Sequence, residues 1–218
     1  MLIHRRKFDI RIYFLTFIRD GFVDVWLYRD CYIKFSTPVF NLNNLDCSVH
    51  VTNYAVQKNF MNSRDCVPNA VENMWPLVEL KKYFESVGAA DVWDGQIYPG
   101  IKKNILAVIS ASLDETELHV NNFELNGADF MIGYDFEPVL IEINWIPDLY
   151  FSKVVVEMIT KKLLEDVIKV VVDYQRDPKS KTGDFELIHS FEVPIVLNEL
   201  NDLKILGKKI KISKESSS

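Results

Sequence analysis

Hydrophobic and polar residues alternate strictly near the start of the chain. From Lys7 to Ile18, one face carries Phe8, Ile10, Ile12 and Phe14, and the other carries Lys7, Asp9, Arg11 and Tyr13. A period of two residues predicts a half-buried β-strand. Asp20-Gly21 predicts a turn, and Val23–Tyr28 predicts a returning strand, so this part of the chain should begin with an antiparallel hairpin.

The segments after this hairpin predict short strands and then helices. Cys31–Phe35 predicts a further short strand, Pro38–Asp46 a loop, and Val49–Asn53 a short extended piece. Apolar residues then recur at helical spacing in Trp75–Val87 and in Ile101–Leu113. Gly88 follows the first of these helices and is a suitable C-terminal cap.

Strands return in the second half of the chain. Asn121–Ile132 and Pro138–Asn144 predict a hairpin closed by the turn at Gly133. A helix is expected over Phe151–Tyr174, and a last strand region over Phe185–Leu197.

The order of these elements predicts an α+β fold, with a largely antiparallel sheet flanked by helices, because it shows no regular βαβ alternation. We expect residues 1–176 to form one partial domain and residues 177–218 a linker, a terminal strand and a basic tail. The polar stripe of the first strand begins almost at residue 1, so we expect the layer facing it to lie outside the chain.

Composition narrows the class of protein. The chain has 218 residues, 48% of them hydrophobic, and a net charge of -6. This charge argues against nucleic acid as the main partner, and no apolar run approaches the roughly 20 residues of a membrane span. Three cysteines without CxxC spacing favour a reducing compartment, which predicts a cytoplasmic protein. The lysines between Lys204 and Lys214 form a solvated tail or contact an acidic partner.

The second predicted hairpin carries the clearest candidate metal site. Its turn brings Asp129 near Glu142 and Asn144, and the two-residue spacing places Glu142 and Asn144 on one face. The neighbouring Ile141 and Ile143 should point into the core. Carboxylate and amide oxygens are ligands that Mg²⁺ accepts, although a polar solvent face would give the same pattern.

Other polar positions are candidates for binding a nucleotide. Lys7 and Arg11 flank Asp9 on one strand face, where the cations can meet phosphates and the carboxylate can accept hydrogen bonds. Thr52 and Asn53 lie at the end of the predicted extended piece and can bind a nucleotide or cap a turn.

Two further cations are weaker candidates. Arg29 can clamp a carboxylate or pair with Asp30, and Lys58 can be a positioned cation or a solvated one. The chain contains no GxSxG, HExxH, Walker A or GxGxxG motif.

Taken in order, five motifs resemble the C-terminal half of the tubulin tyrosine ligase-like family. They are Lys-Phe-Asp-Ile-Arg, Tyr-Arg-Asp, His-Val-Thr-Asn-Tyr, Gly-Ala-Asp-Phe-Met and Ile-Glu-Ile-Asn. The likeness runs from about Arg6 to Tyr174, and Asn44–His50 and Phe185–Ile188 look most like the glycylase branch. The resemblance implies an ATP-grasp fold and ATP-dependent ligation of glycine to glutamate side chains of tubulin tails through an acyl phosphate.

The resemblance also implies roles for individual residues. The expected Mg²⁺ ligands are Asp129, Glu142 and Asn144, with Glu142 also catalytic. ATP would be bound by Lys7, Asp9, Thr52 and Asn53. Arg11 would face the phosphates as a catalytic cation, and Arg29 and Lys58 would hold the amino acid or the acceptor.

The resemblance leaves three alternatives and one departure. The chain is similar to glycylases, but polyglutamylase-type ligation, a truncated non-catalytic tubulin-binding relative and a more distant small-molecule ATP-grasp ligase are the other interpretations. Trp145 stands where the family has a small residue, so we expect it to crowd the substrate or to loosen a nearby loop. The expected partners are glycine, tubulin and microtubules, and the expected location is the cytoskeleton, with cilium or flagellum by the glycylase resemblance.

Overall fold

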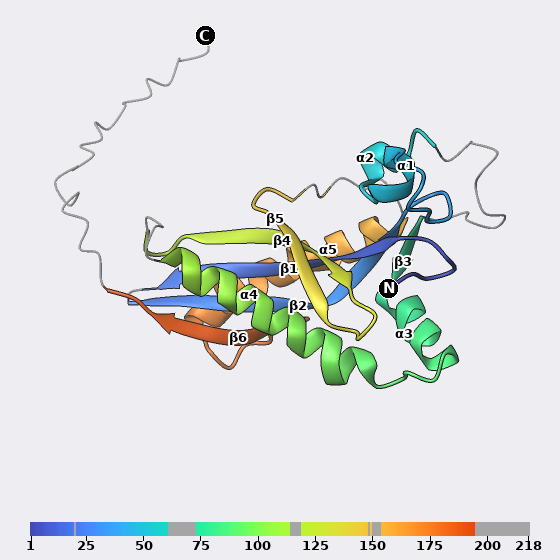
Figure 1. Cartoon of the computed structure of the whole chain (residues 1–218). Coiled ribbons are helices and arrows are strands. Elements are labelled where there is room, and N and C mark those ends of the chain that lie inside the picture. The colour runs from blue at the N-terminus through green and yellow to red at the C-terminus, as the bar shows by residue number, and fades with distance from the viewer. Residues whose placement is uncertain (20, 61–72, 114–118, 148, 150–153, 195–218) are drawn as a thin grey trace, which may run out of the picture.

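A six-stranded sheet, antiparallel at each pairing, forms the centre of the structure (Figure 1). The computed structural model describes residues 1–19, 21–60, 73–113, 119–147, 149 and 154–194. The strand order is β3-β2-β1-β4-β5, and β6 also pairs with β2. The strands are β1 (Phe8–Arg19), β2 (Phe22–Phe35), β3 (Met74–Pro76), β4 (Phe123–Ile132), β5 (Pro138–Asn144) and β6 (Phe185–Glu192).

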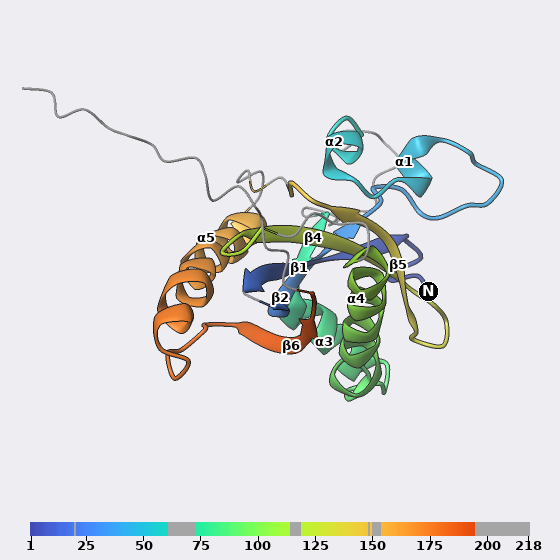
Figure 2. The same ribbon diagram turned by 90° about the vertical axis from the view of Figure 1, so that its left-hand side faces the viewer.

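Helices cover both faces of this sheet. They are α1 (Cys47–His50), α2 (Tyr54–Gln57), α3 (Leu77–Ser86), α4 (Tyr98–Ser112) and α5 (Val154–Ile168). Short π-helical segments, Trp93–Ile97 and Lys169–Tyr174, precede α4 and follow α5. In Figure 2 the sheet lies between α5 on one side and α4 on the other. The predicted α+β architecture with a largely antiparallel sheet and flanking helices is therefore confirmed.

Alternation along β1 divides the core into two clusters. Phe8, Ile10 and Ile12 belong to the cluster that includes side chains of α3 and α4. Tyr13 and Leu15 belong to the cluster that includes side chains of α5. Each fully buried apolar side chain contributes on the order of 1.5–3 kcal/mol, so both faces of β1 help to fix its position in the sheet.

Three predicted boundaries were wrong. Residues 22–35 form one strand with a register shift, because the β1–β2 ladder continues past the irregularity between Ile12 and Phe14. Val49 and His50 lie in α1, whose N-terminus is capped by Asp46, and Val51 after the helix is extended. Trp75 belongs to β3, and the helix begins at Leu77 after Pro76.

The region after residue 176 joins the same sheet. β6 pairs with the first half of β2, from Phe22 to Tyr28. The buried carboxylate of Asp166 accepts hydrogen bonds from Tyr28 Oη at 3.2 Å and from Asp184 N at 3.0 Å, which fixes the chain just before β6. The predicted basic tail, Lys204–Lys214, lies outside the described residues.

Among the described helices, none is both long enough and apolar enough to span a bilayer.

Candidate functional site

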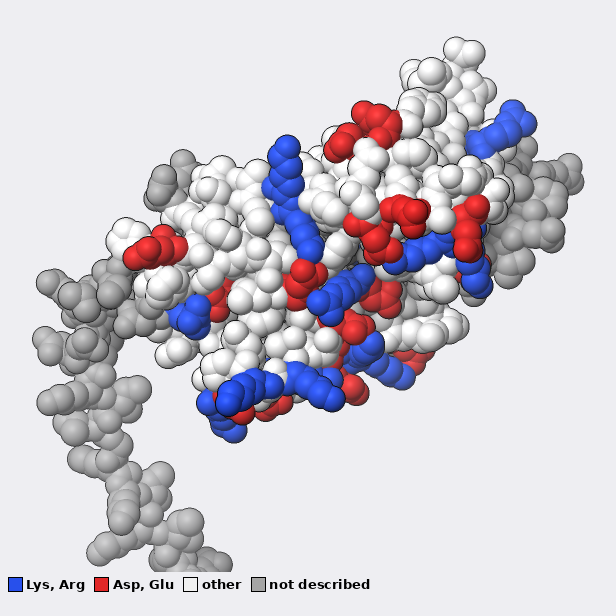
Figure 3. All heavy atoms as spheres, turned by 90° about the horizontal axis from the view of Figure 1, so that it is seen from below, with Lys and Arg blue, Asp and Glu red and all other residues white. Residues whose placement is uncertain are grey.

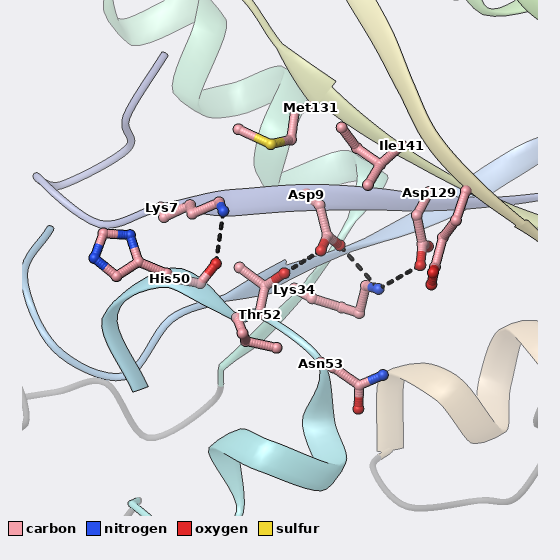
Figure 4. A pocket seen from close by; sticks show the side chains of 11 residues that line it. Lys7, Asp9, Lys34, His50, Thr52, Asn53, Asp129, Met131 and Ile141 are labelled. Carbon is pink, nitrogen blue, oxygen red and sulfur yellow. Dashed lines mark hydrogen bonds and ion pairs between the residues drawn. The ribbon is translucent and has the colours of Figure 1, made fainter. Parts of the chain in front are cut away.

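A pocket of about 250 Å³ opens where β1, β2, β4 and β5 meet the α1–α2 segment (Figure 4). It combines carboxylates, ammonium groups and three apolar side chains. The lining residues are Lys7, Asp9, Lys34, His50, Val51, Thr52, Asn53, Asp129, Met131, Ile141 and Glu142. Six of the predicted site residues are therefore gathered at one place, although they come from segments more than a hundred residues apart.

Four buried charges form a cluster at this site, and all but Arg11 line the pocket. Arg11 donates from Nε to Asp129 Oδ1 at 2.5 Å and from Nη2 to Oδ2 at 2.8 Å. Lys34 Nζ lies 3.0 Å from Asp9 Oδ1 and 3.1 Å from Asp129 Oδ2, and Figure 4 shows it between the two carboxylates. The four residues are between 4% and 8% exposed. Two cations and two anions balance, which buried charges require.

The pKa values of the two carboxyls move in opposite directions. Burial raises the pKa of Asp9, and the nearby charge of Asp129 adds to this rise, against the lowering effect of Lys34. Burial also opposes ionisation of Asp129, but the hydrogen bonds from Arg11 and the charge of Lys34 outweigh it and lower the pKa of this carboxyl. Asp129 is therefore the firmly ionised member of the pair.

The β4–β5 hairpin places the predicted metal ligands as expected. Asp129 lies directly opposite Glu142, and Gly127 lies opposite Asn144. Asn144 Nδ2 donates to Glu142 Oε1 at 3.2 Å, which is consistent with side chains on one face. Glu142 is exposed and lines the pocket, so its carboxylate is accessible.

Ile141 does not point into the core, and the prediction that it would do so was wrong. The β4–β5 register shifts between Asp129 and Phe130, and Ile141 has no partner in the ladder. This bulge turns the side chain outward, where it is 53% exposed and lines the pocket beside Met131. The pocket thus gains an apolar wall that the alternation pattern could not reveal, whereas Ile143 packs against the core as expected.

The α1–α2 segment closes the opposite side of the pocket. Lys7 Nζ donates to the His50 carbonyl at 2.6 Å, and the Thr52 hydroxyl donates to Asp9 Oδ2. The Asn53 side chain caps α2 by accepting from Ala55 N at 2.9 Å, which is the turn-capping role weighed from sequence. Part of the layer facing the polar stripe of β1 is therefore supplied by the chain itself.

A buried amide holds this segment against the sheet. Gln57, 1% exposed, accepts from Thr37 N at 2.6 Å and donates from Nε2 to Ser48 O at 2.9 Å and to Val51 O. These bonds tie α2 to α1 and to the chain after β2. Gln57 therefore positions Thr52 without lining the pocket itself.

Arg29 and Lys58 lie outside this pocket. Arg29 has a 59% exposed side chain with Nε 3.6 Å from Glu186 Oε2, next to the pair formed by Lys102 and Glu186. Lys58 is exposed at the end of α2. The structure therefore does not bring either cation to the carboxylates that line the pocket.

The buried cation that sequence reasoning missed is Lys34. It is the register partner of Asp9 in the β1–β2 ladder. The alternation along the strand could have shown this. Tyr32 and Lys34 are two residues apart, so their side chains share one face of the sheet. Trp145 is 74% exposed and is not a lining residue, so its expected effect on the substrate or on a nearby loop stays a prediction.

These groups fit a magnesium–nucleotide complex by their chemistry. Asp129 and Glu142 offer hard oxygen ligands, Lys7 and Lys34 offer positive charge to phosphates, and Met131 and Ile141 offer an apolar surface to a base. Within the described ranges, no group of three or more His, Cys, Asp or Glu residues is arranged to hold a metal ion. A metal here would need oxygen ligands from the nucleotide as well.

The charged surface gives no comparable site on the face shown in Figure 3. Basic and acidic side chains are interspersed there. Among the described residues, several surface charges are paired, as in the Lys102–Glu186 and Lys162–Asp184 ion pairs.

Comparisons with known proteins all indicate one protein family. The model of the tubulin-tyrosine ligase family matches residues 1–180. Tubulin glycylase 3B of Drosophila melanogaster is 45% identical over 216 residues, 96% of this chain and 28% of the relative. Tubulin monoglycylase TTLL3 of Homo sapiens is 39% identical over 198 residues, 89% of this chain and 26% of the relative. Protein monoglycylase TTLL8 of Mus musculus is 37% identical over 189 residues, 86% of this chain and 23% of the relative. The chain thus spans about a quarter of the length of these curated relatives.

Proposed function

Because this chain belongs to the tubulin-tyrosine ligase family, we propose that it carries part of the active site of a tubulin glycylase. The enzyme joins glycine to glutamate side chains in tubulin C-terminal tails, and the fold is the C-terminal part of an ATP-grasp domain. Relatives named tubulin glycylase and monoglycylase support this reaction. The observation that carries the proposal is the placement of Asp129 opposite Glu142 in a pocket that also holds two lysines.

ATP, bound with Mg²⁺, supplies the phosphoryl group that activates the acceptor carboxylate. The overall reaction consumes ATP and releases ADP and phosphate as the glycine amine forms an isopeptide bond. Asp129, Glu142 and Asn144 would hold the metal, and Lys7, Asp9, Thr52 and Asn53 would hold the nucleotide.

The chain's own contribution is positioning and charge. Arg11 and Lys34 place positive charge beside Asp129 in a buried setting, where a negative phosphate is stabilised far more than in water. The carboxylate of Asp9 is fixed by the Thr52 hydroxyl and by Lys34. No side-chain nucleophile is required, since both reactants are held in place and the acceptor carboxylate attacks directly.

The acceptor and the place of action follow from the same assignment. An acidic tubulin tail would reach the pocket from the solvent side at Glu142, and microtubules of the cytoskeleton, including those of cilia or flagella, would be the site of action. The face shown in Figure 3 carries charges of both signs. The positive charge that attracts the acidic tail would therefore lie on other surfaces.

Isothermal titration calorimetry of the 218-residue chain with Mg·ATP tests the binding site. Glu142→Gln should abolish binding without unfolding the chain, because it removes a ligand charge from an exposed side chain. Glu124→Gln is the matched control, since Glu124 is also exposed and lies on β4 outside the pocket lining. Equal binding by wild type and Glu142→Gln would show that the hairpin is not the metal site.

A ligation assay tests the reaction itself. The chain is incubated with ATP, Mg²⁺, tubulin and either labelled glycine or labelled glutamate. Incorporation of glycine alone supports the proposal, and incorporation of glutamate alone replaces it with polyglutamylation. Mg·ATP binding without transfer of either amino acid assigns the chain to a non-catalytic role.

A further inference from the structure

Both oxygens of Asp129 already have basic partners. Oδ1 accepts from Arg11 Nε, and Oδ2 accepts from Arg11 Nη2 and lies 3.1 Å from Lys34 Nζ. A carboxylate has about four acceptor positions, so three of them are in use. Basic side chains therefore already occupy most of the acceptor positions of the proposed metal ligand.

The second proposed ligand also has a hydrogen-bond partner. Glu142 Oε1 accepts a hydrogen bond from Asn144, at 3.2 Å. The described residues hold no preformed cluster of metal-binding side chains. Ammonium and guanidinium groups thus lie next to the carboxylate that would bind the metal.

A divalent cation arriving alone would meet an electrostatic obstacle. It would have to approach Asp129 within a few ångströms of Lys34 and Arg11, both buried. If it displaced them, a buried cation would lose its partner, which is strongly unfavourable. A polyphosphate that enters the pocket lowers this cost, because its oxygens provide new partners for the displaced cations.

We propose that Lys34 is a resident counter-ion that excludes free divalent metal from Asp129 until a polyphosphate draws its ammonium away. Metal and nucleotide would then bind as one complex. The proposal rests on the function assigned above and describes how that site is regulated. Lys34 is a positioning residue here, since it acts through Asp129.

Binding of Mn²⁺, used as a probe for Mg²⁺ and followed by electron paramagnetic resonance without nucleotide, tests the exclusion. Lys34→Met should bind free Mn²⁺ at least tenfold more tightly than wild type does. Lys34→Gln should act in the same direction and is expected to fold more readily, because its amide still donates a hydrogen bond to the two carboxylates.

Lys7→Met is the matched control. It removes the same charge from the same pocket, but Lys7 Nζ is bonded to the neutral carbonyl of His50 and not to a carboxylate. Its Mn²⁺ affinity should stay within about threefold of wild type. Adding inorganic triphosphate should raise the Mn²⁺ affinity of wild type strongly and that of Lys34→Met much less, because the variant has no ammonium group to be drawn away from Asp129.

The outcomes separate this inference from the proposed function. Unchanged or weaker Mn²⁺ binding in both folded Lys34 variants overturns the counter-ion role, and so does an equal gain in Lys7→Met. If Lys34→Met gains affinity that depends on Glu142 while wild type binds no Mg·ATP, the counter-ion role stands and the catalytic proposal for this chain fails.

Discussion

Arg11 and Asp129 face each other across β1 and β4 and form two hydrogen bonds, at 2.5 and 2.8 Å. This bidentate pair links the central strand to the hairpin that carries Glu142. The pair is buried, so its geometry is protected from water and salt. The position of the proposed metal ligand is thus set by a residue 118 positions away in sequence.

Removing Arg11 should destabilise the fold. Arg11→Met leaves Asp129 buried with one cation fewer, and we expect the free energy of unfolding to fall by about 3–5 kcal/mol. The double variant Arg11→Met/Asp129→Leu should recover most of that loss, because no charge is stranded. Urea denaturation measures both. Additive losses in the double variant would contradict a direct pairing.

The two carboxyls should give opposite pH dependences of stability. The pKa of Asp129 is lowered from 3.8, so its contribution to stability is complete above pH 3.8 and is lost as pH falls through the lower folded-state pKa. The pKa of Asp9 is raised from 3.8, so its contribution is present below pH 3.8 and is lost as pH rises through the higher folded-state pKa. Urea denaturation of wild type, Asp129→Asn and Asp9→Asn between pH 2 and 7 checks this. If both substitutions changed the pH dependence of the unfolding free energy in the same way, the opposite pKa shifts would be contradicted.

Gln57 should control the α1–α2 side of the pocket. Gln57→Leu leaves buried backbone groups without partners, which costs about 1–3 kcal/mol. Hydrogen exchange at Thr37 N should quicken, and Mg·ATP affinity should fall because Thr52 is less well placed. Gln175→Leu removes an amide that donates to Val170 O in the helical region after α5. It should leave Thr37 exchange and nucleotide affinity unchanged, and equal effects of the two variants would refute the positioning role.

Alanine substitutions at two glycines should distinguish the cost of backbone strain from the cost of steric overlap. Gly88 has φ +78, and a methyl group added to its Cα would have no neighbouring atom within 4 Å, so Gly88→Ala should cost about 1 kcal/mol from left-handed strain alone. Gly183 has φ +65, and an added Cβ would overlap the Asp166 carboxylate. Gly183→Ala should therefore cost about 2 kcal/mol more than Gly88→Ala, which is typical of overpacking. Thermal unfolding of both variants checks the difference, and equal losses would show that the carboxylate moves aside freely.

Local patterns in the sequence predicted most of the elements. The alternation in β1, the helical stripes of α3 and α4, and the β4–β5 hairpin all rest on interactions within one segment or between adjacent ones. The same logic placed Asp129 near Glu142, because a hairpin fixes its own pairing by a short turn.

The tertiary structure decided which side chains meet in the pocket. The bulge that exposes Ile141 depends on how β4 and β5 pair, and a period-two pattern cannot show where the period is broken. The separation of Arg29 from the pocket and the inclusion of Lys34 depend on the register of β2 against β1. The sequence by itself thus determined the family and most of the strands, and it supplied the candidate ligands. Only the folded chain decided which charges are buried together, because charge burial is set by contacts between residues far apart along the chain.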